Sequence, residues 1–209
     1  MLTGRFFVTG TNTGVGKTWV ACELLKQASR ANKRCYGVKP VASGCTQVQG
    51  ELRNEDAMAL MKASSIKLSY SMTNPFAFEP AVAPHWAAQQ VDCTLSVAQL
   101  VDGTEAALSH QAELVLVEGA GGWLVPLNAK ETLADYAQAL GYPVIMVVGL
   151  TLGCINHALL TAEAIKQSGL SLAAWVPNAT PSAEQPREEQ EANIAYLTAA
   201  LGVAPLLII

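Results

Sequence analysis

The stretch VTGTNTGVGKT, residues 8–18, is the part of the sequence whose residue types and spacing most clearly predict chemistry. Small residues let successive backbone N–H groups point inward around an anion, and a helix that begins after such a loop adds its positive N-terminal end. Lys17 would then reach the β- and γ-phosphates of a nucleotide, and the Thr18 hydroxyl would bind Mg²⁺. The residues that we expect to line this nucleotide site are Thr13, Gly14, Val15, Gly16, Lys17 and Thr18.

The match to the phosphate-loop pattern GxxxxGK[ST] is imperfect. Thr11 stands where the pattern has its first glycine, and Gly10 stands one place too early. The alternative interpretation is an ordinary glycine-rich turn between a strand and a helix. The GKT triplet, together with an apolar run before it and a helical pattern after it, favours the phosphate loop.

Lys39 is a second candidate. It directly follows an apolar run, residues 35–38, and precedes Pro40, whose ring biases the lysine toward an extended conformation. This places Lys39 at the carboxyl end of a strand, where open α/β sheets bind their ligands. A lysine taken alone is more often a solvated surface residue, so its candidacy as a catalytic residue depends on the phosphate loop.

Two acids complete the candidate set. Glu118 ends the run LVLV and is followed by GAGG, a backbone that permits close approach beside the phosphate loop. Asp56 opens a helical stretch, where an acid is ordinarily a cap or a partner of the helix dipole. Together with Thr18, these carboxylates would supply three oxygen ligands to Mg²⁺, and phosphates and waters would complete the shell. The residues after Glu118 that we expect at the nucleotide are Gly119, Ala120 and Gly121.

The elements that must position these residues follow from an alternation of patterns. Short valine-rich runs indicate strands buried on both faces, and segments with helical spacing separate them. The alternation predicts right-handed crossovers and a mostly parallel sheet with helices on both faces, in one α/β domain of the phosphate-loop NTPase type over residues 1–209. A composition of 51% apolar and 14% charged residues agrees. The expected strands are residues 5–9, 35–38, 114–117, 144–148 and 172–176.

Three stretches depart from this alternation. Residues 64–90 contain Pro75, Pro80 and Pro84, and we interpret them as a long loop over the site. Residues 178–187 are polar and connect the last clear strand with the last helix. Residues 205–209 are apolar, and we predict a further strand there.

Charge and cysteine content narrow the class of protein. A formal net charge of −4 without a basic cluster excludes nucleic acid and anionic membrane as expected partners. No run approaches the roughly 20 apolar residues of a membrane span, and no export signal is apparent. The cysteines are dispersed without a CxxC pair, which predicts neither disulfides nor zinc but a cytoplasmic protein. They are Cys22, Cys35, Cys45, Cys93 and Cys154.

At this point the sequence resembles one family, the dethiobiotin synthetases, along nearly its whole length. The shared motifs, in the order of the family, are TGTNTGVGKT, KPVASG, RNEDA, NPFAFEPAVAPH, VLVEGAGGW, VVGLTLGCINHALLT and WVPN. KPVASG and EGAGGW, together with the phosphate loop, separate this family from its relatives. The resemblance implies an ATP- and Mg²⁺-dependent cyclo-ligase of biotin synthesis that converts 7,8-diaminononanoate and CO₂ or bicarbonate to dethiobiotin, with ADP and phosphate released.

The resemblance also implies roles for individual residues. Lys39 and Lys17 match the catalytic lysines, and Thr13 and Ser43 match positions near the substrate amines and the carbamate. Asn178 matches the asparagine that contacts adenine. In the family, a helix start of the neighbouring subunit holds the substrate carboxylate, which implies a homodimer. The matching residues here are Gly153, Cys154, Ile155 and Asn156.

The sequence also departs from the family pattern. Some members have glutamate where this chain has Gly14, and an aspartate often follows the asparagine where this chain has Ala179. The family continues with a GEIP-type segment that helps to hold the base, whereas this sequence ends at Ile209. Weaker adenine selectivity and a segment missing from this sequence are alternative interpretations.

Two other classes of protein are rivals. Partitioning ATPases are nucleotide switches with a related fold, but they usually carry a signature lysine at the position of Thr11. Cobyrinate-type amide synthetases need an additional glutaminase domain, for which 209 residues are too few.

Overall fold

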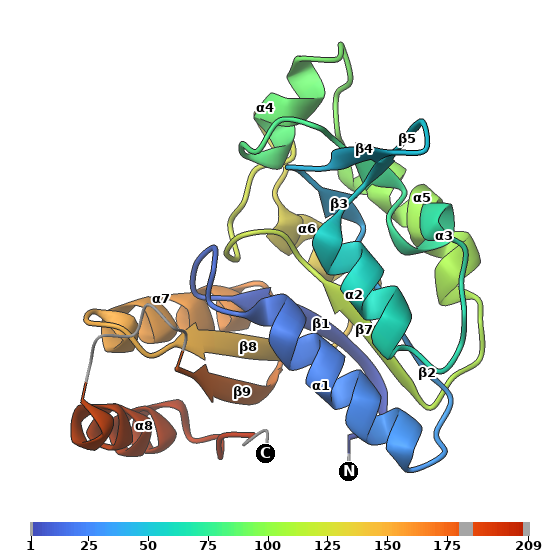
Figure 1. Ribbon diagram of the computed structural model, residues 1–209. Helices are drawn as coiled ribbons and strands as arrows, with labels where there is room; N and C mark the ends of the chain where they lie inside the picture. Colours follow the sequence, from blue (N-terminus) through green and yellow to red (C-terminus); the bar gives the residue numbers. More distant parts are fainter. Residues whose placement is uncertain (1, 180–185, 207–209) are drawn as a thin grey trace.

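Five parallel strands form the central sheet of the computed structural model, which describes residues 2–179 and 186–206 (Figure 1). Their order is β2-β7-β1-β8-β9, and every neighbouring pair is parallel. The five predicted strands are confirmed; β2 has the predicted bounds, and the other four extend by one or two residues at one or both ends. The strands are β1 Gly4–Gly10, β2 Cys35–Val38, β7 Leu114–Glu118, β8 Val144–Gly149 and β9 Leu172–Asn178.

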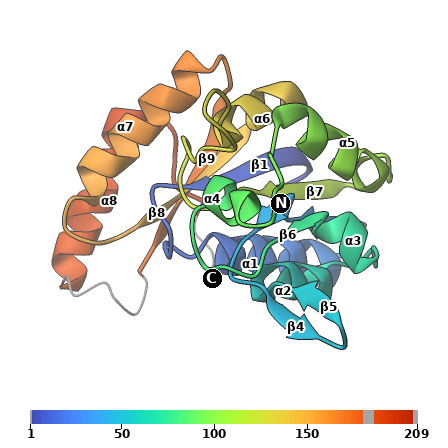
Figure 2. The same ribbon diagram turned by 90° about the horizontal axis from the view of Figure 1, so that it is seen from above.

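Helices cover both faces of this sheet, as the alternation of patterns predicts. Figure 2 shows α1 and α2 on one side and α5, α6 and α7 on the other. Along β1, Phe7 packs in the core under α5 to α8, whereas Phe6 and Val8 pack under α1 and α2, because successive strand residues face opposite ways. The helices are α1 Lys17–Arg30, α2 Glu55–Ala63, α5 Val97–Leu108, α6 Leu133–Leu140, α7 Cys154–Gln167 and α8 Arg187–Leu201.

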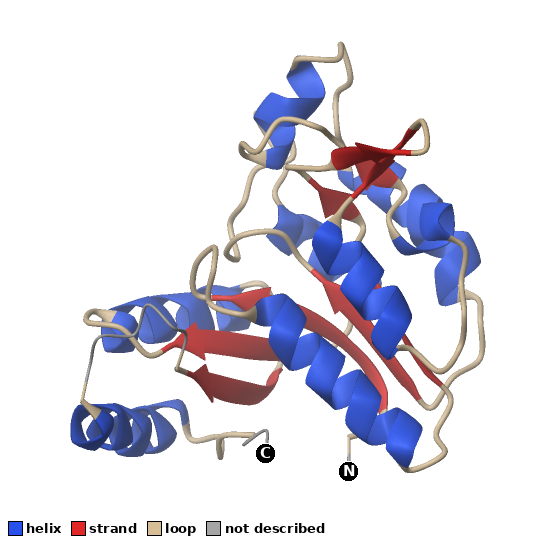
Figure 3. Ribbon diagram, in the orientation of Figure 1, coloured by secondary structure: helices blue, strands red, loops and turns tan. Residues whose placement is uncertain are grey.

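The interpretation of residues 64–90 as a long loop is partly wrong, because short elements interrupt it (Figure 3). Helix α3, Tyr70–Thr73, begins where the Ser69 hydroxyl accepts from the Met72 N–H, and α4, Pro84–Gln89, begins with a proline at its first position. Strand β6, Phe76–Ala77, pairs with β3, Val41–Ala42. A hairpin of β4, Thr46–Val48, and β5, Glu51–Arg53, precedes α2.

The two remaining stretches lie partly outside the described residues. Positions 180–185 of the polar connection and positions 207–209 of the apolar end are not described. Before them, Pro205 forms a parallel bridge with Trp175, and the Leu206 N–H donates to the Trp175 carbonyl. The five cysteines are free thiols. Among the described helices, none combines the length and apolarity needed to cross a membrane.

Candidate nucleotide and catalytic site

The predicted phosphate loop connects the end of β1 at the centre of the sheet with the start of α1. Gly14 and Gly16 have φ angles of 75° and 88°, which L side chains rarely adopt, and Gly16 is the N-cap of α1. The Asn178 side chain closes over this loop, where its Nδ2 donates to the Val15 carbonyl at 2.8 Å. A Cβ on Gly16 would lie 2.1 Å from that Nδ2 atom, so the close approach requires glycine.

Lys17 turns inward from the first turn of α1 and is 7% exposed. Its Nζ donates to the Asn12 carbonyl at 3.1 Å, a contact that curls the loop around the ammonium. Burial, and to a smaller extent the charge of Lys39, lowers the pKa of Lys17 to about 8, against the opposing effect of Glu118 and Asp56. The site therefore holds a cation that lacks a full countercharge, and a bound anion would supply it.

Lys39 lies at the carboxyl end of β2 and is fixed through its backbone. Its N–H donates to the Thr73 carbonyl at 2.7 Å, and its own carbonyl accepts from Asn74 Nδ2 at 2.7 Å. Its Nζ bridges two carboxylates, at 2.7 Å from Asp56 Oδ2 and 2.6 Å from Glu118 Oε1. The three charged candidates from β2, α2 and β7 thus meet in one cluster.

The balance of charges in this cluster determines its protonation. Burial by itself would lower the pKa of Lys39, but Glu118 and Asp56 outweigh that effect and hold the pKa above its ordinary value. For Asp56, burial acts to raise the pKa, and the adjacent Lys39 ammonium outweighs burial and holds it below the usual range. Lys39 is therefore a fully protonated, buried cation at neutral pH.

Glu118 is fully buried, and one of its two carboxylate oxygens accepts hydrogen bonds while the other does not. Its Oε1 accepts from Lys39 Nζ and, at 2.7 Å, from Thr18 Oγ1. Its Oε2 has no hydrogen-bond partner among the described residues. A buried oxygen without a partner is costly, and a carboxylate next to a hydroxyl and a second carboxylate is a donor set that suits Mg²⁺. In the described chain no three His, Cys, Asp or Glu side chains group together, so a cation here would need other ligands as well.

A cavity of about 320 Å³ brings most of the sequence-predicted residues together. Two residues that sequence reasoning missed also line it, Ala42 and Asn54. Asn54 is the N-cap of α2, and an asparagine before a helix that starts with acids could have indicated this. The predicted residues that line this cavity are Thr13, Gly14, Gly16, Lys17, Thr18, Lys39, Ser43, Asp56, Ala120 and Gly121.

A second cavity, of about 470 Å³, shares four of these residues, including Thr13 and Ser43. Its other walls are apolar, and residues missed by sequence reasoning supply them: Ala81, Val82, Ala83, Pro84 and Val125. Of the remaining predicted residues, Val15 is buried within the loop itself, and Glu118 and Gly119 are buried at the end of β7.

The predicted carboxylate site lies elsewhere in the chain. Gly153 is the N-cap of α7, with a φ of 89°, and the helix begins at Cys154 as the pattern predicts. The amides of Ile155 and Asn156 have no backbone acceptor in the described part of the chain, whereas that of Cys154 donates to the Thr151 carbonyl. Residues 153–156 line neither cavity at the phosphate loop, so a single chain does not bring them to it.

Comparison with solved structures shows the fold. The chloroplast FtsY of Physcomitrella patens is 15% identical with a TM-score of 0.55, over 98% of this chain and 58% of that chain. A ParA family ATPase from Chlorobium tepidum is 11% identical with a TM-score of 0.54, over 99% of this chain and 84% of that chain. At these identities the similarity extends to the fold alone.

Comparison with known sequences is more specific. Residues 4–208 match the family model described as an AAA domain. The ATP-dependent dethiobiotin synthetase BioD of Pseudomonas paraeruginosa is 52% identical over 190 residues, 91% of this chain and 83% of that protein. The enzyme of the same name from Marinobacter nauticus is 50% identical over 202 residues, 97% of this chain and 85% of that protein. Identity of about 50% over more than nine tenths of this chain and more than four fifths of these relatives means that this chain belongs to the dethiobiotin synthetase family.

Proposed function

We infer that the protein is an ATP-dependent dethiobiotin synthetase, a cyclo-ligase of biotin synthesis that acts on 7,8-diaminononanoate, CO₂ and ATP. The observation that carries this function is the cluster of Lys39, Glu118, Asp56 and Thr18 beside the phosphate-loop Lys17. The names of relatives that are about 50% identical along the chain support the same activity.

The reaction joins two anions. One substrate amine attacks CO₂ and forms a carbamate, with loss of a proton. A carbamate oxygen then attacks the γ-phosphorus of ATP and ADP leaves. The second amine attacks the carbamate carbon of this mixed anhydride, phosphate leaves, and the ureido ring closes.

The charges of Lys17 and Lys39 suit the phosphoryl-transfer step. The carbamate and the triphosphate repel each other, so the site must supply fixed positive charge in a place that water does not screen. Both lysines are buried and line the same cavity. We propose that Lys17 holds the phosphates, while Lys39 stabilises charge on the transferring phosphoryl group and on the carbamate.

The residues present fit a magnesium ion at the phosphates. Thr18, Asp56 and the unpartnered oxygen of Glu118 would hold it, as the oxygen donors of this cluster. When bound, Mg²⁺ neutralises phosphate charge and orients the β- and γ-oxygens. A magnesium–nucleotide structure with Glu118 more than about 6 Å from the metal would contradict this assignment, because even a water-bridged contact would then be too long.

The second cavity suits an aliphatic diamine. Its polar end carries the hydroxyls of Thr13 and Ser43, which can donate to or accept from the two amines and the carbamate, and its other walls, around Val82 and Val125, are apolar. Holding both amines in one geometry makes ring closure effectively unimolecular. We propose that Asn178 contacts the nucleotide base, because its side chain is already fixed at the phosphate loop.

We further propose a cytoplasmic homodimer in which the α7 start of each chain, residues 153–156, binds the substrate carboxylate in the site of the other. The substrate is long, and these amides line neither cavity of their own chain. Leu152, just before this helix start, and Leu160, in the middle of α7, are 90% and 64% exposed and would be covered in a twofold interface. The five free thiols suit a reducing compartment.

Subunit mixing tests the shared site. Subunits with Lys39→Gln and subunits with Ile155→Pro are each expected to be inactive as homodimers. Mixed dimers should regain up to one intact site per pair. An absence of activity in proven heterodimers, or an active monomer in sedimentation, would overturn the shared site.

Turnover separates this function from a nucleotide switch. Phosphate release should require both diaminononanoate and bicarbonate, and dethiobiotin should form in equal amount. Hydrolysis of ATP at the same rate without the diamine would favour the switch instead.

A further inference from the structure

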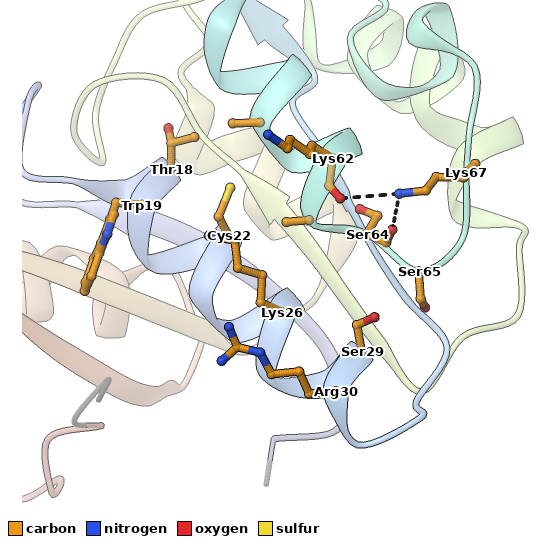
Figure 4. A pocket seen from close by; sticks show the side chains of 12 residues that line it. Thr18, Trp19, Cys22, Lys26, Ser29, Arg30, Lys62, Ser64, Ser65 and Lys67 are labelled. Carbon is orange, nitrogen blue, oxygen red and sulfur yellow. Dashed lines mark hydrogen bonds between the residues drawn. The ribbon is translucent and has the colours of Figure 1, made fainter.

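A third and larger cavity, a groove between α1 and α2, lies beside the two cavities described above (Figure 4). Its volume is about 740 Å³, and Thr18 is the one lining residue that it shares with the nucleotide cavity. The groove therefore begins at the phosphate loop and runs along the outer side of the two helices toward the C-terminal end of α2. The residues that line it are Thr18, Trp19, Cys22, Lys26, Ser29, Arg30, Ala59, Lys62, Ala63, Ser64, Ser65 and Lys67.

Positive charge dominates this lining. It contains four cations and no acid, in a chain whose formal net charge is −4. The side chains of Arg30 from α1 and Lys62 from α2 have no ion-pair or hydrogen-bond partner within the described residues. Lys26 is paired with Glu23 at 2.7 Å, so its charge is locally balanced. Two cationic side chains without countercharge in one groove attract an anion.

Lys67 lines the groove, but backbone carbonyls of this chain use all three of its N–H donors. Its Nζ donates to the carbonyls of Ser64 at 2.6 Å, Met61 at 3.1 Å and Lys62 at 3.3 Å, so it caps the C-terminal end of α2. The hydroxyls of Ser29 and Ser65 lie at the same end of the groove (Figure 4). These hydroxyls, and not Lys67, would therefore supply the hydrogen-bond donors for a ligand anion at this end.

The other part of the lining is apolar. Trp19 forms one wall and is 51% exposed, and Cys22, Ala59 and Ala63 contribute small apolar surfaces. An exposed indole offers a flat face on which a ring or a short hydrocarbon can pack. A bare inorganic anion would leave this surface unused, whereas a charged group on an apolar body would contact both parts.

We propose that the α1–α2 groove binds a small organic anion, a carboxylate, sulfonate or phosphate ester that carries an aromatic or short aliphatic body. Arg30 and Lys62 supply the positive charge that attracts the anionic group, and Trp19 packs against the body. This site is separate from the ATP and diamine cavities and is independent of the function proposed above.

The fluorescent sulfonate 8-anilinonaphthalene-1-sulfonate is a suitable probe, used with saturating Mg²⁺ and ADP so that the nucleotide cavity does not contribute. We expect saturable binding of this probe. The double variant Arg30→Gln, Lys62→Gln should weaken the affinity about tenfold, because two exposed ion pairs to the sulfonate are lost and each contributes less than a factor of ten. The matched control Lys130→Gln, which removes an exposed cation elsewhere, should leave the affinity unchanged. Trp19→Ala should weaken binding of the probe as well.

Two further probes test separately whether the groove requires the negative charge and the apolar body of its ligand. The neutral N-phenyl-1-naphthylamine should bind far more weakly than the sulfonate, and inorganic phosphate should displace the sulfonate only at much higher concentration. Circular dichroism should show that all variants stay folded, because the substituted side chains are exposed. Unchanged affinity in the folded double variant, equal binding of the neutral probe, or displacement by phosphate at the same concentration would each overturn the proposal.

Discussion

Lys39 Nζ lies 2.6 Å from Glu118 Oε1, and both side chains are almost completely buried. A buried ion pair contributes little by itself, because desolvation offsets most of the attraction. Removing one partner is different, since the remaining charge then stays buried without its partner. The contact therefore makes Lys39 and the strand-end acid Glu118 depend on each other for stability.

Glu118→Gln is expected to destabilise the nucleotide-free protein by about 3 kcal/mol, since Lys39 keeps only the partly exposed Asp56 as a countercharge. Urea unfolding measures this loss. Glu113→Gln is the matched control, because it breaks a surface pair with Lys33 and should have little effect. Equal stability of the two variants would contradict a tightly coupled pair at Lys39.

Lys39→Gln is expected to lower turnover by orders of magnitude while ATP affinity changes little, because the charge of this lysine matters most as charge develops in the transition state. Isothermal titration with ATP and a phosphate-release assay give the two quantities. Lys33→Gln serves as a surface control. Wild-type turnover in the Lys39 variant would refute its assignment as a catalytic residue.

Lys17→Met is expected to stabilise the nucleotide-free protein at pH 7, although it should abolish phosphate binding. Burial lowers the pKa of Lys17 to about 8, so the folded chain holds this proton less tightly than the unfolded chain, where the pKa is near 10.5. The cost of the buried Lys17 charge to the free energy of unfolding is complete below pH 8. It disappears as the pH rises from 8 toward 10.5, because the unfolded chain binds more protons than the folded chain in that range. Thermal unfolding at pH 7 and pH 10 should show the advantage of the variant shrinking with pH. A wild type that is more stable than the variant at pH 7 would contradict this account.

Gly16→Ala is expected to damage the phosphate loop more than Gly14→Ala. Both glycines have positive φ angles, so both substitutions carry backbone strain of about 1 kcal/mol. A Cβ at Gly16 would also collide with Asn178 Nδ2, whereas a Cβ at Gly14 meets no atom within 4 Å. Titration with ADP and Mg²⁺ should show a large loss of affinity for Gly16→Ala and a small one for Gly14→Ala. Equal losses would mean that strain alone, and not the contact with Asn178, limits this position.

The five sheet strands could be predicted because parallel strands buried on both faces leave continuous apolar runs, as in residues 144–148. The short elements between residues 64 and 90 could not, since their stability depends on pairing with β3 and on caps such as Ser69 and Pro84. For the site, strand ends predicted that Lys39 and Glu118 would share one edge of the sheet. Their direct contact depends on side-chain rotamers and burial, which no sequence pattern reports.

The hydrogen bond from Asn178 to the Val15 carbonyl joins residues that are 163 positions apart. A ribosome makes the whole phosphate loop early, but the side chain that closes over the loop arrives only when β9 has been made. Contacts at such long sequence separation form late in folding, because the intervening chain must first be ordered. We therefore expect a nascent chain to have the GKT triplet long before it has a complete nucleotide site, so that ATP binding reports that the entire sheet, out to its edge strand, has assembled.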